Sequence, residues 1–238
     1  MALPLYLAMT ASEIASSNTL PANFAYMACH YSAFSQGLSN IPSALPENSV
    51  LILNDNFPCQ DHSPSLVADQ LKELVDTFHC ESLLLDFQRP PEPESKAMAE
   101  KILRVLPCPT ALTPEYGKDL DCALFLPPCP LHVPLEDYLE PWKGREIWLE
   151  AALCQEDVLV TKEGSRFVPY FPTGHLTGGF FDKDLCCNYN IDTAPEQITF
   201  TLFDTPENME QKLALAESLG VVRAVGLWQE LGTFQTRK

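Results

Sequence analysis

Residues 80–90, which read CESLLLDFQRP, decide the fold that this sequence predicts. The apolar run from Leu83 to Leu85 is typical of a parallel strand that is covered on both faces. Asp86 and Gln88 are two positions apart, so their side chains point to the same side of that strand. The segment therefore predicts a buried strand that delivers polar side chains at its carboxyl end, where α/β proteins place their sites.

Amphipathic helices are expected on both sides of this strand. Ser63 and Pro64 predict the start of the first helix. Its apolar residues recur at helical spacing: Val67, Leu71, Leu74 and Phe78. Ser95 is expected to cap the second helix, and Pro107 is expected to end it. This alternation of helix and strand predicts an α/β fold.

The rest of the chain continues the alternation. Further strands are expected at residues 3–9, 23–26, 49–56, 110–112, 122–126, 146–151 and 224–228. Together with the strand in residues 80–90 they predict a (β/α)8 TIM barrel. The barrel is expected to be trimmed, because such folds typically need ~250 residues and this chain has 238.

An excursion is expected after the seventh strand. Residues 158–160 and 167–168 flank the turn at 162–165 and predict a β-hairpin. The hairpin and the loop that follows it to Asn190 interrupt the alternation, before a strand at 198–203. We expect the excursion to form a lid or wall at the barrel mouth. Because no linker or repeat is visible, residues 1–238 are predicted to form a single domain.

Several motifs resemble those of the family 18 glycoside hydrolases, the chitinase-like barrels. The family's fourth-strand pattern, Asp-Gly-x-Asp-x-Asp-x-Glu, falls on Glu81, Ser82, Leu84, Asp86 and Gln88. The helix that contains Lys212, and the strand that leads to Trp228, are similar to the family's last helix and eighth strand. The chain therefore resembles a degenerate relative of this family, with only the last Asp of the pattern kept.

The resemblance implies a sugar site at the barrel mouth without the family's chemistry. In the family, a Glu at the position of Gln88 protonates the leaving oxygen, while an Asp at the position of Asp86 orients the attacking acetamide. Gln88 has no carboxylic proton to donate. The family's sixth-strand Tyr-Asp pair is also missing, because residues 124–128 read LFLPP. The resemblance further implies that Trp228 stacks beneath the sugar ring.

Other carboxylates keep hydrolysis open as a hypothesis. Asp86 on the fourth strand, with Glu150 on the seventh or with Glu230, is a candidate pair for an active glycosidase. The alternatives are an ion pair between Asp86 and Arg89, and a solvated strand end at Glu150. His30 follows the second strand and is a further candidate for a ligand-binding residue.

The charge of the chain restricts its partners. Lys and Arg number 15 against 32 Asp and Glu, which gives a net charge of −17. Because this field repels polyanions, neither nucleic acid nor membrane is expected as a partner. A carbohydrate ligand is what the family resemblance implies. Residues 1–15 contain no basic residue of a secretory signal, so a cytoplasmic location is expected. The oligomeric state is not specified by the sequence.

Cysteine and histidine patterns point to no metal or cofactor. The nine cysteines contain no CxxC pair and are expected to be reduced, buried thiols. The five histidines show no HxxxH or HxH spacing, and no glycine-rich phosphate-binding motif occurs.

Three functional hypotheses follow from the sequence. The first is a catalytically silent, glycoside-hydrolase-like protein that binds an N-acetylated glycan at the barrel mouth. The second is an active glycosidase that uses Asp86 with Glu150 or Glu230. The third is a non-enzymatic interaction protein, which an apolar plug from the hairpin in the mouth would favour.

Overall fold

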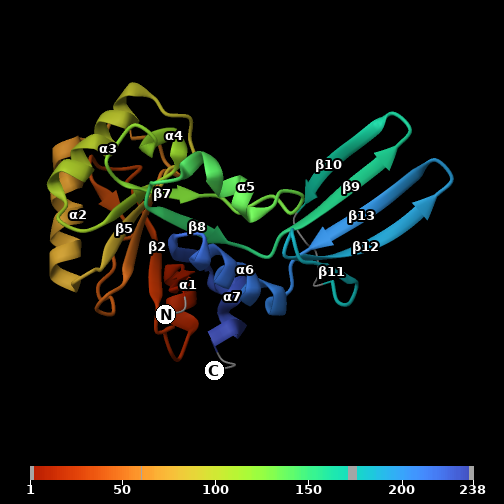
Figure 1. Ribbon diagram of the computed structural model, residues 1–238. Coiled ribbons are helices and arrows are strands. Elements are labelled where there is room, and N and C mark those ends of the chain that lie inside the picture. The colour runs from red at the N-terminus through yellow and green to blue at the C-terminus, as the bar shows by residue number, and fades with distance from the viewer. Residues whose placement is uncertain (1–2, 60, 171–175, 236–238) are drawn as a thin grey trace.

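The computed structural model describes residues 3–59, 61–170 and 176–235. Within them, eight parallel strands close into a barrel (Figure 1). These are β1 (Leu5–Met9), β2 (Phe24–Tyr31), β4 (Val50–Asn54), β5 (Ser82–Asp86), β6 (Thr110–Leu112), β7 (Ala123–Leu126), β8 (Ile147–Ala151) and β14 (Val221–Leu227). Closure is made by β1, which pairs with β2 on one side and with β14 on the other. The predicted (β/α)8 barrel is confirmed.

The helices around the barrel are unequal in length. The longest are α2 (Pro64–Phe78), α3 (Pro93–Val105) and α6 (Pro206–Ser218). The others are short: α1 (Ala11–Ser16), α4 (Pro114–Gly117), α5 (Leu135–Leu139), the 3-10 turn η1 (Glu140–Trp142) and α7 (Trp228–Gln235). A two-residue strand, β3 (Leu38–Ser39), pairs antiparallel with the end of β2. The short helices make this the trimmed barrel that the chain length predicts.

Proline and a polar cap start the long helices. Ser63 caps α2 as predicted, and its hydroxyl accepts a hydrogen bond from the backbone N–H of Leu66. The prediction for the next helix is wrong, because Glu92 is the N-cap of α3 and Ser95 lies in its first turn. The Ser95 hydroxyl accepts from the Glu92 N–H instead, at 2.9 Å. Pro93, at the first helical position, moves the start of α3 forward from the predicted cap.

Side chains alternate between the barrel interior and the helix layer. In β5, Leu84 belongs to the apolar cluster inside the barrel, whereas Leu83 and Leu85 pack with residues of α2 and α3. All three are at most 1% exposed. Because strand residues point alternately to opposite faces, Asp86 falls on the same side as Leu84 and faces the interior.

A polar network occupies the amino end of the barrel. The guanidinium of Arg223 lies 4.8 Å from the ring centre of Tyr6 and 4.4 Å from that of Trp148. It donates hydrogen bonds to the Ser82 hydroxyl and the Glu81 carboxylate. Glu81 and Ser82, on which the family pattern begins, thus contribute to packing at the end opposite the mouth.

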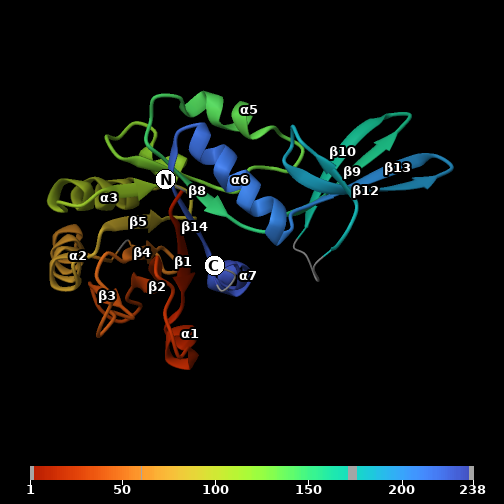
Figure 2. The same ribbon diagram turned by 60° about the horizontal axis from the view of Figure 1, so that its bottom comes forward.

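The excursion after β8 is a five-stranded antiparallel sheet. It comprises β9 (Gln155–Thr161), β10 (Gly164–Tyr170), β11 (Phe180–Asp182), β12 (Cys187–Ala194) and β13 (Gln197–Phe203). Their order across the sheet is β10-β9-β13-β12-β11. The predicted hairpin is confirmed as β9 and β10, but much of the predicted loop that follows is strand. Figures 1 and 2 both show this sheet projecting to one side of the barrel.

The base of this sheet is tied to the barrel at one junction. Leu131, in the loop after β7, packs with Cys187 and Leu202 of the sheet. Where the chain leaves and re-enters the barrel, the Asp204 N–H donates to the Cys154 carbonyl at 2.9 Å. The Asp204 carboxylate accepts from the Cys154 N–H and from Lys212, the latter at 2.6 Å.

Most of the cysteine side chains are buried, as expected. All nine cysteines are free, and six of them are buried: Cys29, Cys59, Cys80, Cys129, Cys186 and Cys187. Among the described helices, none combines the length and apolar character that crossing a membrane requires.

Candidate functional site

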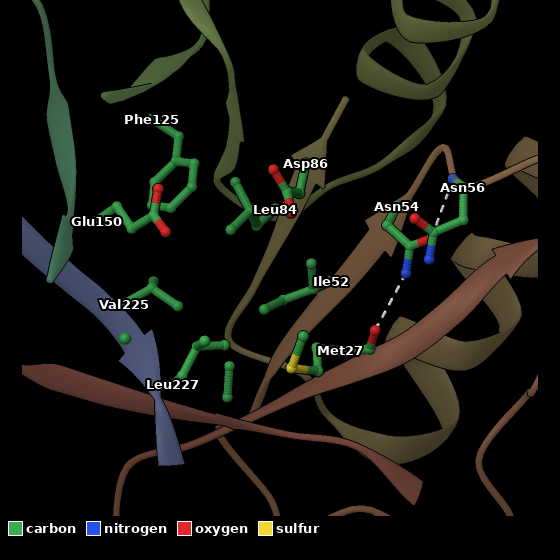
Figure 3. A pocket seen from close by; sticks show the side chains of 12 residues that line it. Met27, Ile52, Asn54, Asn56, Leu84, Asp86, Phe125, Glu150, Val225 and Leu227 are labelled. Carbon is green, nitrogen blue, oxygen red and sulfur yellow. Dashed lines mark hydrogen bonds between the residues drawn. The ribbon is translucent and has the colours of Figure 1, made fainter. Parts of the chain in front are cut away.

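A cavity of about 150 Å³ lies at the carboxyl ends of the barrel strands. Figure 3 shows its lining, which combines apolar side chains from the barrel interior with polar side chains from the strand ends. The lining residues are Ala8, Met27, Ile52, Asn54, Asn56, Leu84, Asp86, Phe125, Glu150, Val225, Gly226 and Leu227. The cavity therefore sits where (β/α)8 proteins hold their ligands.

Two carboxylates reach this cavity from strands on different sides of the barrel. Asp86 is the last residue of β5 and lies beside Asn54 of the neighbouring strand. Glu150 lies two residues after Trp148, whose ring is fully buried inside the barrel, so both side chains point inward from β8. The structure thus brings together Asp86 and Glu150, one of the carboxylate pairs that the sequence suggests (Figure 3).

The environment of Glu150 favours its protonated form. Burial, together with the nearby charges of Asp86 and Glu230, raises the pKa of this carboxyl from 4.5 to about 7. Asp86 loses its proton first, and its charge then holds the proton on Glu150. Near neutral pH the cavity therefore contains one carboxylate and one carboxyl that is close to half ionised.

Asp86 is held by the residue at the family's acid position. The Gln88 side-chain amide donates a hydrogen bond to the Asp86 carboxylate. Burial raises the pKa of Asp86, the bond from Gln88 lowers it, and the charge of Asp55 raises it again, with a net upward shift. Gln88 is exposed and acts on Asp86 as a neutral donor.

The loop that carries Gln88 is fixed by Asp55. One carboxylate oxygen of Asp55 accepts the Gln88 N–H at 2.9 Å, and the other accepts the Arg89 N–H at 3.0 Å. The Arg89 side chain also donates a hydrogen bond from Nε to the Asp55 backbone carbonyl, at 2.8 Å. Arg89 thus anchors this loop, and the ion pair with Asp86 that the sequence left open as an alternative is not seen among the described contacts.

Sequence reasoning missed the two asparagines and the phenylalanine of the lining. Asn54 and Asn56 follow the apolar strand β4, and Phe125 lies in β7, at the segment where the family's Tyr-Asp pair is missing. Asn54 is itself fixed, because its amide donates to the Met27 carbonyl and its oxygen accepts the Asn56 N–H. A polar triplet, Asn54 to Asn56, directly after a buried strand was the signal that could have identified the first two.

The other predicted site residues lie around the cavity and outside its lining. Glu230, in α7, accepts a hydrogen bond from the Leu153 N–H at 3.2 Å. Trp228 is the first residue of α7 and packs closely over Gly232. His30 bonds the Tyr31 carbonyl through Nδ1, and its ring lies 5.1 Å from that of Phe57. Their roles in ligand binding stay predictions.

The inserted sheet does not plug the mouth. The cavity lining, as far as the described residues define it, includes no residue between 155 and 203. A metal site is not formed either, because the described residues contain no group of three or more His, Cys, Asp or Glu arranged around one point. The site is thus an open cavity with two carboxylates at the mouth of a (β/α)8 barrel.

Comparison with known proteins identifies the fold. No family model and no curated protein matches this chain in sequence. Among solved structures, a chitinase from Chromobacterium violaceum matches with a TM-score of 0.59 and 11% identity, over 99% of this chain and 97% of that one. A chitinase-like agglutinin from Robinia pseudoacacia matches with a TM-score of 0.59 and 14% identity, over 98% of each chain.

A third similar structure is a family 18 chitinase from Cycas revoluta, a double mutant solved in complex with (GlcNAc)4. It matches with a TM-score of 0.59 and 12% identity, over 99% of this chain and 98% of that one. The fold is therefore that of the family 18 glycoside hydrolases, as the sequence motifs predict. At these identities the comparison defines the fold alone, and the function has to be argued from the site.

Proposed function

We propose that the protein binds an N-acetylated hexosamine glycan at the barrel mouth without hydrolysing it. The observation that supports this most is the amide of Gln88, which occupies the family's acid position and donates to Asp86. An amide can hold a glycosidic oxygen by hydrogen bonding, but it cannot protonate the leaving group. General-acid catalysis contributes about 10²–10⁴-fold, so its loss at this position favours binding over turnover.

The size of the cavity supports the seating of one substituent. A cavity of about 150 Å³ compares with engineered cavities of roughly the same volume that bind benzene. An N-acetyl group fits this space, with its amide N–H directed to Asp86 and its methyl group against Leu84 or Ile52. The sugar rings then lie across the mouth, and binding is expected to be weak, about micromolar to millimolar.

Two of the similar structures agree with this role. The Cycas revoluta chitinase in complex with (GlcNAc)4 carries a glutamate-to-glutamine substitution. The Robinia pseudoacacia protein is described as an agglutinin. One of these barrels is thus a mutant chitinase in complex with a glycan, and the other is an agglutinin. Glycan binding without hydrolysis is the behaviour proposed for this chain.

Calorimetry with N-acetylglucosamine tetramer tests the proposal. Binding is expected, with the intact tetramer recovered after incubation, and Asp86→Asn should weaken it. Asp76→Asn is the matched control, because Asp76 lies on the exposed face of α2 and pairs there with Lys72. Gln88→Glu alone should not restore turnover, since the sixth-strand Tyr-Asp pair is also missing. Absence of binding by any acetamido sugar would contradict the proposal.

An active glycosidase is the second candidate, because Asp86 and Glu150 share one cavity. A carboxyl with a raised pKa beside an ionised carboxylate is the arrangement of an acid and its partner in glycosidases. A screen of aryl glycosides tests this candidate. Hydrolysis that Glu150→Gln abolishes would establish it over binding alone. If the wild type hydrolyses none of them, the candidate is excluded.

A further inference from the structure

A second pocket lies near the carboxyl end of β5, on the side that faces the helices. Asp86 faces the barrel interior, and the next residue, Phe87, belongs to the apolar cluster that packs with α2 and α3. Phe87 lines a pocket of about 80 Å³, together with the buried residues Tyr31, Cys59 and Tyr116. As far as the described residues define the two linings, this outer pocket and the central cavity have no residue in common.

The hydroxyl of Tyr31 is buried in this wall without a hydrogen-bond partner. Tyr31 is the last residue of β2 and is 1% exposed. Within the described part of the chain, no group donates to its hydroxyl or accepts from it. Burial raises the pKa of Tyr31 well above its usual value, with further contributions from Cys59, Asp55 and Tyr116. All three of these neighbours line the outer pocket, so the hydroxyl end of the ring lies toward it.

The polar groups beside Tyr31 have their hydrogen bonds made. The Tyr116 hydroxyl donates to the Ser95 oxygen at 3.0 Å and lies 3.2 Å from the Arg89 carbonyl. Both carboxylate oxygens of Asp55 accept backbone N–H groups. A buried O–H that stays unsatisfied costs free energy, and such groups are rare in native structures. The Tyr31 hydroxyl therefore indicates an occupant that offers it an acceptor.

The charges around the pocket favour a neutral occupant. Asp55 and Glu92 contribute two carboxylates to the lining, and Arg89 contributes one guanidinium. That guanidinium already donates to the backbone carbonyls of Asp55 and Asn56. An anion would lie close to both carboxylates, and a cation has no acceptor for the Tyr31 O–H. A carbonyl oxygen supplies the acceptor without adding charge.

The shape of the pocket restricts the occupant further. The rings of Phe87 and Tyr116 meet edge to face with their centres 5.2 Å apart, and the Tyr31 ring lies 6.0 Å from that of Phe87. These rings give the pocket apolar walls, while the phenolic oxygen of Tyr116 keeps the capacity to accept an N–H. A volume of about 80 Å³ equals that of roughly two to three water molecules. A small, flat group with one acceptor and one donor fits these limits.

We propose that the outer pocket binds a compact neutral amide. Its carbonyl oxygen accepts the Tyr31 O–H, its N–H lies toward the Tyr116 oxygen, and its methyl or methylene group packs against Phe87. The inference goes beyond the proposed glycan-binding function and does not depend on it, because the described linings of the two sites are separate.

A protein-observed NMR titration with acetamide tests the outer pocket. Binding is expected in the millimolar range, about 1–50 mM for so small a ligand, with shifts of the Phe87 and Tyr116 resonances. Tyr31→Phe should weaken it about three- to tenfold, as the loss of one neutral hydrogen bond implies. Acetate and acetone are similar in size and should bind more weakly, because acetate is charged and acetone has no N–H.

Tyr26→Phe is the matched control. Tyr26 lies in the same strand and is also buried, but its hydroxyl donates to the Asn40 carbonyl at 2.7 Å. This variant should keep the affinity for acetamide and lower the urea midpoint of unfolding. Tyr31→Phe should not lower the midpoint, because the hydroxyl that it removes has no partner. Equal losses of stability would show that the Tyr31 hydroxyl is already satisfied, which overturns the inference.

N-acetylglucosamine, as a further probe, distinguishes two sources of the same group. If it displaces acetamide at Phe87 and Tyr116, the site is supported and the amide is one carried by a sugar. If acetamide binds and is not displaced, the site is supported and the amide is a small primary one. No binding of acetamide, or binding that Tyr31→Phe leaves unchanged, would show that water alone fills the pocket and that the inference is wrong.

Discussion

The barrel and the five-stranded sheet bury their strands in different ways. Every residue from Ser82 to Leu85 in β5 is buried, because barrel strands pack against side chains inside and helices outside. In the inserted sheet one face is polar and the other is apolar. The apolar face includes a row in register across four strands, formed by Phe167, Val158, Phe200 and Ile191. Phe167 is 45% exposed and Ile191 49%.

The difference shows what each region contributes to stability and to the site. The barrel has a closed apolar interior, and Asp86 and Glu150 lie where that interior meets the mouth. Partial burial there raises the pKa values of both carboxyl groups. Among the described residues, an apolar cluster covers the sheet at its base, around Leu131, Cys187 and Leu202, and the His132 ring stacks on Phe167. Substitutions in the barrel and at the junction should therefore have larger effects than similar substitutions in the outer part of the sheet.

The largest effect is expected at the junction between the two regions. Lys212→Met leaves the Asp204 carboxylate, which is 1% exposed, without its counter-charge. Burial alone would lower the pKa of Lys212, but the Asp204 charge outweighs it and the pKa is raised. Breaking such a buried pair costs about 3–5 kcal/mol. Urea unfolding measures this loss.

The control for this prediction is a surface pair. Lys143→Met removes the pair with Glu140, in which both side chains are well exposed, and should cost about 0–1 kcal/mol. If the two variants lose equal stability, the junction has no special role in joining the sheet to the barrel.

Core packing gives the next comparison. Leu85→Ala removes a fully buried side chain between β5 and the helices, and should cost about 2–5 kcal/mol. Ile198→Ala removes a side chain that is 40% exposed on the apolar face of the sheet, and should cost less than about 1 kcal/mol. Both values come from chemical denaturation. A large loss for Ile198→Ala would show that another molecule or segment covers this face in solution.

The pH dependence of stability tests the environment of Glu150. The pKa of this carboxyl is raised from 4.5 to about 7 in the folded protein. Between these values the folded state holds more protons than the unfolded state, so Glu150 makes stability fall as pH rises from 4.5 to 7. Below this window its effect is absent, and above it the full penalty, roughly 3 kcal/mol for a rise from 4.5 to about 7, applies.

Glu150→Gln should therefore stabilise the protein at pH 8 more than at pH 5. Glu163→Gln, on the exposed turn of the sheet, is the matched control and should give equal stabilities to the wild type at both pH values. Asp86, whose pKa is also raised, keeps part of the pH dependence in the variant. An unchanged pH profile for Glu150→Gln would place this carboxyl in a wetter environment than the cavity indicates.

The smallest effect is expected in the shape of the unfolding transition. Residues 1–238 are predicted to form one domain, so that barrel and sheet unfold together in a single step. The two hydrogen bonds between Cys154 and Asp204, one through the Asp204 N–H and one through its carboxylate, couple the two regions together with the cluster at Leu131. Tryptophan fluorescence reports on the barrel, because Trp142, Trp148 and Trp228 all lie outside the sheet. A transition by circular dichroism that does not coincide with it would show two separate units.

Local patterns in the sequence determined the fold and one part of the site. The apolar run before Asp86 and the regular alternation of strands and helices required only the short-range rules of side-chain direction. They predicted the barrel, and they placed Asp86 and Gln88 on the same side of the fourth strand at its carboxyl end. They failed for residues 180–190, because the Asn and Asp residues there are typical of loops, while β11 and β12 are stabilised by pairing with each other and with β13.

Tertiary structure alone decided which residues meet at the mouth. Glu150 and Asp86 are 64 positions apart by their residue numbers. From the sequence, Glu230 was as much a candidate for the partner carboxylate as Glu150, and Trp228 was a candidate for ligand binding. Closure of the barrel brings Glu150, Asn54 and Phe125 into the lining, whereas Trp228 begins a helix and packs over Gly232. The pKa of Glu150 likewise depends on burial and on charges from other strands and helices. Such quantities are set by distances through space, which the order of residues along the chain does not specify.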